Sequence, residues 1–281
     1  MSKQLDVTDH SRDSAGMTYV YPVLSRRAGG VSIGINLNPN NACNWRCIYC
    51  QVPGLKRGAA PRIDLALLEN ELRQFIDAIK HGDFMRTQVP ADMRKIVDVA
   101  FSGNGEPTSA REFPQAIELV GRVLLETRLD TALTLRLITN GSLLGRKLVQ
   151  EGLRRLDALR GEVWFKVDAG TTEGYRRINN ADLTPGSVAR NLRRCARLCS
   201  TWVQTCVFAL DGMGPSEEEM TAYLHVLRQA GIEYLAGVHL YGLARPSQQP
   251  EADRLASLPA DRMETIAHYL RAEGLTVFVN P

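Results

Sequence analysis

Short apolar segments rich in β-branched residues alternate along the chain with longer segments of helical periodicity. Segments of the first kind predict strands at about 31–37, 96–101, 133–139, 163–168, 201–208, 234–240 and 275–279. Segments of the second kind predict helices near 63–81, 111–127, 143–159, 185–199, 216–230 and 259–273. Strands that alternate with helices usually pair in parallel, so the pattern predicts an α/β fold. The number of these units suits a partial (β/α)6 TIM-like barrel of parallel strands with outer helices.

The composition is typical of a globular chain. With 281 residues, of which 44% are hydrophobic, the chain can bury a sizeable core and is not intrinsically disordered. It contains no run of about 18 apolar residues, so neither a transmembrane helix nor a membrane partner is expected. The polar start lacks an apolar signal segment, which indicates a cytoplasmic location. No internal repeat or linker is visible, and the pattern therefore favours one domain over residues 1–281.

Six cysteines in such a chain suggest metal or redox chemistry rather than disulfides. Three of them, Cys43, Cys47 and Cys50, lie in the segment NACNWRCIYC, whose composition favours a loop. A short loop can wrap three thiolates around one metal centre. A structural zinc needs a fourth ligand, and the nearest downstream histidine, His81, lies beyond a predicted helix. The spacing favours a [4Fe–4S] cluster with one open iron, with zinc and unmetallated thiols as the alternatives.

The spacing Cys-x-x-x-Cys-x-aromatic-Cys, with Tyr49 in the aromatic position, resembles the cluster loop of the radical S-adenosylmethionine (SAM) superfamily. FSGNGEPT at 101–108 is similar to the glycine-rich segment that follows the second strand of that family. LITNGS at 137–142 and KVDAG at 166–170 resemble the ends of its third and fourth strands. Together with SRRAGGVSIGINLNPNNACN before the loop, these motifs most resemble the branch that contains the wyosine-type tRNA-modifying enzymes. The resemblance covers about 20–245, which leaves an N-terminal extension and a C-terminal βα addition.

The resemblance implies an iron–sulfur oxidoreductase that uses a [4Fe–4S] cluster and SAM. Such an enzyme cleaves SAM reductively to a 5′-deoxyadenosyl radical, which abstracts hydrogen from a substrate. The cluster needs an external one-electron donor of the flavodoxin or ferredoxin type, and no obligate protein partner is expected. The branch makes a tRNA base the leading substrate. The alternatives are a peptide or small metabolite as substrate or, in a different class, a zinc-stabilised RNA-binding protein without redox activity.

The same motifs suggest which residues contact SAM. Gly103 and Gly105 allow close backbone approach, Asn104 can donate hydrogen bonds, and Glu106 can accept one from the methionyl ammonium. Tyr49 is expected against the adenine or the cluster. The remaining SAM-binding candidates, for the carboxylate or the ribose, are Asn140 and Ser142. The structural alternatives are an ordinary Gly/Pro turn for the glycine-rich segment, loop packing for Tyr49 and a turn-forming Asn-Gly for Asn140.

The fourth predicted strand carries two charged residues on one face. Trp164, Lys166 and Asp168 alternate with the apolar residues at 163, 165 and 167, which must meet the helices. Lys166 and Asp168 are therefore expected inside the barrel, where charges are costly unless they are paired or functional. They are the candidate catalytic residues: Asp168 for the SAM ribose, and Lys166 for an anionic group or a Schiff base. A mutual structural ion pair is the alternative.

The second cysteine group, Cys195, Cys199 and Cys206, is predicted to be packing rather than a second cluster. Cys195 and Cys199 fall on the apolar stripe of a helix, and about seven residues of strand, roughly 20 Å, separate Cys199 from Cys206. Residues 145–200 are basic, with twelve Lys and Arg against six Asp and Glu, although the net charge of the chain is only +3. This asymmetry suggests either an RNA-facing patch or helix faces with ion pairs.

Overall fold

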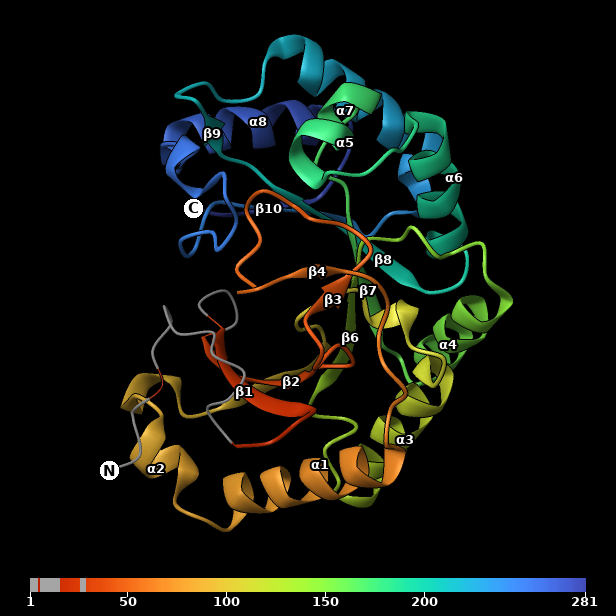
Figure 1. Cartoon of the computed structure of the whole chain (residues 1–281), viewed down its shortest axis with the longest axis vertical. Helices are drawn as coiled ribbons and strands as arrows, with labels where there is room; N and C mark the ends of the chain where they lie inside the picture. Colours follow the sequence, from red (N-terminus) through yellow and green to blue (C-terminus); the bar gives the residue numbers. More distant parts are fainter. Residues whose placement is uncertain (1–4, 6–15, 26–28) are drawn as a thin grey trace.

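The computed structural model describes residue 5 and residues 16–25 and 29–281. Most of its strands form one curled sheet with helices along the outer side (Figure 1). In spatial order the strands of this sheet are β1 (Val20–Ser25), β2 (Gly30–Ile35), β5 (Ile96–Phe101), β6 (Thr134–Thr139), β7 (Glu162–Lys166), β8 (Ser200–Cys206), β10 (Gly237–Tyr241) and β12 (Val277–Asn280). All neighbours are parallel except β1, which is antiparallel to β2. The predicted α/β fold and partial barrel are confirmed.

The outer helices follow the curled sheet in an arc and leave its other side open (Figure 1). They are α1 (Leu65–Lys80), α3 (Phe113–Glu126), α4 (Lys147–Ala158), α6 (Pro185–Ala196), α7 (Glu217–Ala230) and α8 (Ala260–Ala272). Several begin at side chains that accept hydrogen bonds from the first turn: Asp64 caps α1, and Thr184 and Ser216 form capping boxes on α6 and α7. In the part of the chain that the structure describes, no helix has the length and apolarity needed to cross a membrane.

Every strand and helix predicted from periodicity occurs, with its ends shifted by a few residues. The short elements were not predicted, because a period cannot be recognised over so few residues. They are α2 (Phe84–Gln88), α5 (Thr172–Asn179), the paired β3 (Ala42–Cys43) and β4 (Lys56–Arg57), and the paired β9 (Ala209–Leu210) and β11 (Leu255–Ala256). The antiparallel edge strand β1 was missed as well. It covers β2, all of whose residues are buried.

Charged side chains inside the barrel are paired with one another. Arg136 on β6 contacts Asp98 on β5 and donates from Nε to Glu162 Oε1 on β7 at 2.5 Å. Ser32 on β2 donates to the same Asp98, and the Trp164 indole donates to Glu162 at 2.9 Å. The contacts join four neighbouring strands across the interior, so these buried charges are not left without partners.

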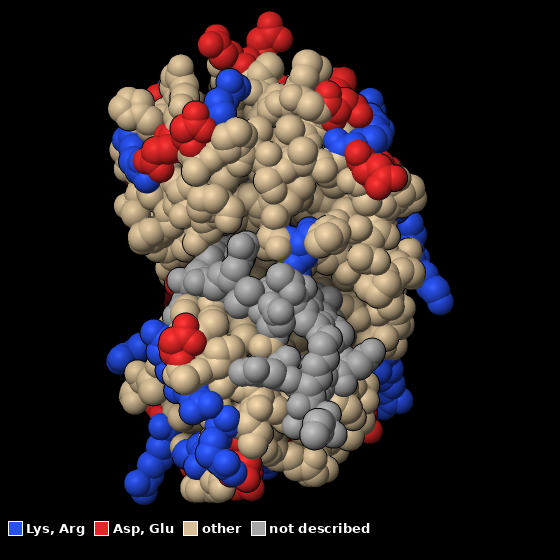
Figure 2. Space-filling model, turned by 90° about the vertical axis from the view of Figure 1, so that its left-hand side faces the viewer, with Lys and Arg blue, Asp and Glu red and all other residues tan. Residues whose placement is uncertain are grey.

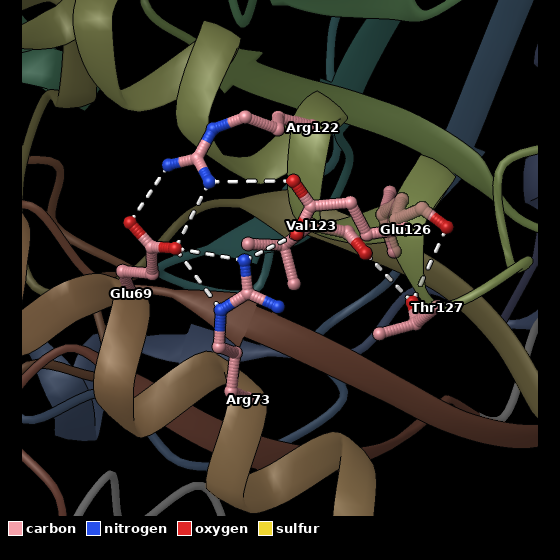
Figure 3. Close-up of polar contacts among 7 residues, drawn as sticks. Glu69, Arg73, Arg122, Val123, Glu126 and Thr127 are labelled. Carbon is pink, nitrogen blue, oxygen red and sulfur yellow. Dashed lines mark hydrogen bonds and ion pairs between the residues drawn. The ribbon is translucent and has the colours of Figure 1, made fainter.

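A network of exposed ion pairs joins α1 to α3 on the outer side (Figure 3). Glu69 on α1 accepts hydrogen bonds from Arg73, one turn further on, and from Arg122 on α3. Glu126 on α3 contacts both arginines in turn. The hydrogen bonds from Arg122 and Arg73 hold the pKa of Glu69 at about 2, below its usual 4.5. The two helices are thus connected by charge as well as by the apolar residues beneath them.

Candidate active site

A cavity of about 530 Å³ opens at the carboxyl ends of the parallel strands. All three cysteines of the first group line it, as does Tyr49 between them. The loops after β5 and β6 and the inner face of β7 supply further predicted residues to its wall: Gly103, Asn104, Gly105, Glu106, Asn140 and Lys166. Ser142 and Asp168 do not line this cavity, but each contacts residues that do. The position agrees with the rule that barrels of this kind carry their chemistry at this end.

The three cysteines lie on the loop between β2 and α1, part of which forms the β3–β4 pair. All are free thiols, and burial raises the pKa of the Cys43 and Cys47 thiols to about 12. Two N–H groups nevertheless point at the sulfurs: the Trp45 amide donates to Cys43 Sγ at 3.4 Å and Asn179 Nδ2 to Cys47 Sγ at 3.2 Å. Buried sulfurs with N–H donors fit bound iron, whose positive charge favours the thiolate that burial alone disfavours. Within the described ranges no three His, Cys, Asp or Glu residues are arranged to hold a single metal ion.

Two distant segments hold the cluster loop from outside. On one side Arg46 N donates to Asn179 O at 3.1 Å and Ile48 N to Ile178 O at 2.8 Å, so the end of α5 is joined to the loop by its backbone. On the other side Ser247 Oγ donates to the Ile48 carbonyl at 2.7 Å. The guanidinium of Arg46 also donates to both carboxylate oxygens of Glu251, at 2.9 and 2.7 Å. Sequence reasoning identified none of these contacts, which join residues far apart in the chain.

Glu106 is fully enclosed at the ends of β5 and β6. Its carboxylate accepts hydrogen bonds from the amide and hydroxyl of Thr108 at 3.1 and 2.6 Å, from Thr139 Oγ1 at 2.6 Å and from Asn140 N at 2.7 Å. Burial raises the pKa of Glu106, although these four donors oppose the shift. The carboxylate thus joins the two strand ends, and its predicted contact with the SAM ammonium stays a prediction.

The glycines at 103 and 105 allow the loop after β5 to approach neighbouring protein groups. A Cβ on Gly105 would lie 2.0 Å from the Ala42 carbonyl oxygen, and one on Gly103 would lie 2.4 Å from Asn36 Oδ1. Gly103 also has φ +135°, which side chains rarely adopt. Asn104 Nδ2 donates to Asn41 Oδ1 at 2.6 Å, whereas its own buried Oδ1 has no hydrogen-bond partner among the residues that the structure describes. Both glycines also line the cavity.

Asn140 and Ser142 form a polar triangle with Asn44 of the cluster loop. Asn44 donates to Ser142 Oγ at 2.7 Å, Asn140 donates to Asn44 Oδ1 at 2.9 Å, and Ser142 Oγ donates to Asn140 Oδ1 at 2.7 Å. The end of β6 is therefore attached directly to the cluster loop. Asn44, which this triangle requires, was not among the predicted residues.

Lys166 and Asp168 face one another at the end of β7, with Lys166 Nζ 4.0 Å from Asp168 Oδ2. Lys166 also donates to the Tyr241 hydroxyl at 2.8 Å and lies over the ring of Tyr49, with Nζ 5.0 Å from its centroid. Burial lowers the pKa of Lys166, but Asp168, Tyr241 and Cys47 together oppose this effect and leave that pKa raised. The amine therefore stays protonated, which suits an anion-binding group better than a Schiff base.

Asp168 is held by three hydrogen bonds from different parts of the chain. It accepts hydrogen bonds from the Tyr49 hydroxyl at 2.5 Å, from Asn179 Nδ2 at 2.8 Å and from Cys206 N at 3.1 Å. Its contacts unite β7, β8, α5 and the cluster loop. The ion pair with Lys166, one of the two interpretations of the sequence, is present; a catalytic role for either residue stays a prediction.

The second cysteine group is buried and divided between two places. Cys195 and Cys199 belong to the main apolar core, whereas Cys206 packs beside Tyr49 and Phe208 and lines the cavity. Thr201 Oγ1 donates to Cys195 Sγ at 3.4 Å. This placement agrees with the prediction that the three thiols do not share one metal centre.

Four arginines of the basic segment 145–200 contact acidic side chains or backbone carbonyls. Arg155, Arg176 and Arg177 form ion pairs with Glu or Asp, and Arg193 donates to the Ala230 carbonyl at 3.0 Å. This segment lies along α4, α5 and α6, away from the open side of the sheet (Figure 1). On the open side, Lys and Arg are mixed with Asp and Glu at both ends, and the described middle is largely uncharged (Figure 2).

The curled parallel sheet and the cysteine loop at its carboxyl end define a radical SAM protein, and comparison with known families agrees. Residues 37–227, more than half of the chain, match the model of the Radical SAM superfamily. The chain belongs to this superfamily and is an enzyme. Membership implies an iron–sulfur cluster and SAM, and radical SAM enzymes generally need an external electron donor.

Curated relatives from Helicobacter pylori and Methanocaldococcus jannaschii carry the name UPF0026 protein. One from Helicobacter pylori is 27% identical over 230 residues, which cover 80% of this chain and 66% of that protein. The one from Methanocaldococcus jannaschii is 28% identical over 158 residues, 56% of this chain and 42% of that protein. The chain thus spans just under two thirds of the first relative and less than half of the second.

Solved structures share the fold at low sequence identity. TYW1 with a lysine-pyruvate adduct bound superimposes with a TM-score of 0.57 at 15% identity, covering 86% of this chain and 73% of that one. A radical SAM methyltransferase from Sphaerobacter thermophilus gives 0.58 at 15% identity, covering 93% and 68%. At these identities the likeness establishes the fold alone.

Proposed function

We propose that Cys43, Cys47 and Cys50 hold a [4Fe–4S] cluster and that the chain cleaves SAM reductively to a 5′-deoxyadenosyl radical, which abstracts hydrogen from a substrate. The observation that carries this proposal is the position of the three thiols. They come from one short loop and line one cavity at the carboxyl ends of the strands. In a chain of the Radical SAM superfamily, this is where cluster and SAM have to meet.

When bound, the cluster supplies one electron at low potential to the sulfonium of SAM. The protein's part is to hold SAM and substrate and to keep water away from the radical. The loops after β5 and β6, with Gly103, Asn104 and Asn140, offer polar groups to the methionyl end. Tyr49 provides a flat surface beside them. The protonated Lys166, held by Tyr241 and Asp168, offers a positive charge to an anionic group of the substrate.

A tRNA base is the proposed substrate, supported by the branch that the motifs resemble and by a fold shared with TYW1. The charge distribution does not single out RNA, because many arginines of segment 145–200 already have partners. A peptide or a small metabolite is the second candidate. It is favoured by the cavity, where Lys166, held beside Asp168, suits a small anionic ligand. The reducing partner is proposed to be a flavodoxin or ferredoxin.

Anaerobic reconstitution with iron and sulfide tests the chemistry. The reconstituted protein, given SAM and a reductant, is expected to release 5′-deoxyadenosine. Changing Cys43, Cys47 or Cys50 to Ala should abolish release, whereas Cys195→Ala, in the apolar core, should retain it. Retained zinc with no 5′-deoxyadenosine would contradict the proposal and favour the zinc-stabilised RNA-binding class.

Comparing a deletion strain with its parent identifies the substrate class. Mass spectrometry of tRNA nucleosides and of metabolites is expected to show a modified nucleoside missing from the deletion strain and restored by the wild-type gene but not by Cys47→Ala. Identical nucleosides together with an accumulated small molecule would exclude tRNA and leave the metabolite alternative.

A further inference from the structure

The side chain of Asn179 joins a cluster cysteine to the charged pair at the end of β7. Asn179 lies at the end of α5 and is completely buried. The amide nitrogen Nδ2 donates to Cys47 Sγ at 3.2 Å and to Asp168 Oδ2 at 2.8 Å. The carbonyl oxygen Oδ1 is buried without a hydrogen-bond partner among the described residues. Burying an amide oxygen without a hydrogen bond costs free energy. The surroundings must therefore favour the orientation in which the amide NH2 group faces the sulfur.

The cause is visible in the surrounding contacts. Asp168, as a carboxylate, can only accept, so the group facing it must be a donor. The backbone of Asn179 is held separately, because its carbonyl accepts from Arg46 N at 3.1 Å. Both the backbone and the side chain of Asn179 are therefore held in place, and its amide NH2 group points between the carboxylate and the thiol.

We propose that Asn179 is a positioning residue for the cluster: it orients Cys47 and, by its N–H···S hydrogen bond, raises the reduction potential of the bound cluster. The inference rests on the proposed function, since it requires a cluster at Cys47. Reduction adds negative charge to the cluster and its sulfurs. An N–H dipole directed at a ligand sulfur stabilises the added charge, and hydrogen bonds to sulfur are one of the means by which proteins set cluster potentials.

The same contact connects the cluster to the wall of the cavity. Asp168 Oδ2 accepts from both Asn179 and the Tyr49 hydroxyl, and Lys166 lies 4.0 Å from the same oxygen. A ligand that binds Lys166 would weaken its attraction for Asp168. Asn179 would then transmit this change to Cys47 through a single side chain.

The test compares Asn179→Leu with Asn180→Gly in the reconstituted full chain. Leu has a similar volume but no donor. Asn180→Gly removes a neighbouring contact to the same loop, from Asn180 Nδ2 to the Arg46 carbonyl at 3.0 Å, and Gly accepts the φ of +49° found there. Redox titration followed by electron paramagnetic resonance gives the midpoint potential. It is expected to be more negative in Asn179→Leu, while Asn180→Gly stays at the wild-type value.

Proton spectroscopy of the reduced cluster provides a second readout that a purely structural role would not change. Spectra in H₂O and D₂O should reveal an exchangeable proton coupled to the wild-type cluster and missing in Asn179→Leu. Asn179→Ala repeats both measurements if the Leu variant does not fold. Equal potentials and an unchanged proton signal in variants with full iron content would overturn the inference. A wild-type chain that binds no iron–sulfur cluster would instead contradict the proposed function.

Discussion

Gly105 illustrates how closely the cluster loop packs against its neighbours. In Gly105→Ala the new Cβ would lie 2.0 Å from the Ala42 carbonyl oxygen and 2.7 Å from the Asn38 side chain. The Ala42 backbone cannot yield as a flexible side chain would. The cluster loop and the loop after β5 must therefore move apart, at a cost of about 1–3 kcal/mol. We expect less iron per chain after reconstitution and a lower free energy of unfolding in urea.

Gly58→Ala is the matched control for this prediction. Gly58 lies on the cysteine loop, after β4, and also faces Ala42, but its added Cβ would meet only the Ala42 Cβ, at an ordinary 3.4 Å. Iron content and stability close to wild type are expected. Equal iron content in the two alanine variants would show that the close approach at Gly105 does not position the cysteines.

Residue types with local chemistry were predictable, and residues that act through distant partners were not. Cys43, Cys47, Cys50 and the segment 103–106 carry their signal in their own spacing, and the structure brings them to one cavity. Asn179 reaches Cys47 across 132 positions of the chain and Glu251 reaches Arg46 across 205. Nothing near either residue in the sequence marks it as part of the site, because the contact exists only after the barrel has formed.

At the scale of elements, the junction between α1 and α3 predicts an acid-dependent stability. The pKa of Glu69 is lowered to about 2 by hydrogen bonds from Arg122 and Arg73, against 4.5 in the unfolded chain. A carboxylate whose pKa is lower in the folded than in the unfolded chain stabilises the fold at pH values above its unfolded pKa. The contribution of Glu69 is therefore complete above about pH 4.5 and is lost as the pH falls toward 2. Exposed pairs contribute about 0.2–1 kcal/mol each.

Glu69→Gln tests this contribution by urea unfolding at neutral pH and near pH 2. The variant is expected to be about 1 kcal/mol less stable than wild type at neutral pH, with the difference vanishing at the acid end. Glu264→Gln removes an acidic group whose partner, Arg271, is on the same helix, and it serves as the control. A difference for Glu69→Gln that persists in acid would assign its effect to packing rather than charge.

Elements were predictable where periodicity extends over a full strand or helix. β5 and β6 were placed almost at their bounds, since each is a continuous apolar or alternating segment. The edge strand β1 has the sequence VYPVLS, and its proline weakens a strand prediction. Helix α5 follows a strong turn signal and has only eight residues, too few for a helical period to be recognised. Both missed elements contact the predicted ones rather than replace them.

At the scale of the whole molecule, a C-terminal segment closes around a loop from the opposite end of the chain. Ser247, Gln249 and Glu251 contact the cluster loop, although they lie beyond the residues 37–227 that match the superfamily. We therefore expect the position of the cysteines to depend on residues outside the matched core. Few residues of the loop are in regular structure, so contacts with other segments are needed to fix its form.

Glu251→Gln tests this dependence, because it weakens the paired hydrogen bonds to Arg46, next to Cys47. Hydrogen bonds between charged groups contribute about 1.5–3 kcal/mol, so the loop should open more often and lose iron faster to a chelator, as followed by visible absorbance. Asp211→Asn is the control. It weakens the equivalent paired hydrogen bonds from Arg254, which is close to Glu251 in the chain, and neither residue is on the cluster loop. If both variants lose iron at the wild-type rate, the segment does not hold the loop. If only Glu251→Gln loses it faster, the fold beyond the superfamily core is what keeps Cys47 in position.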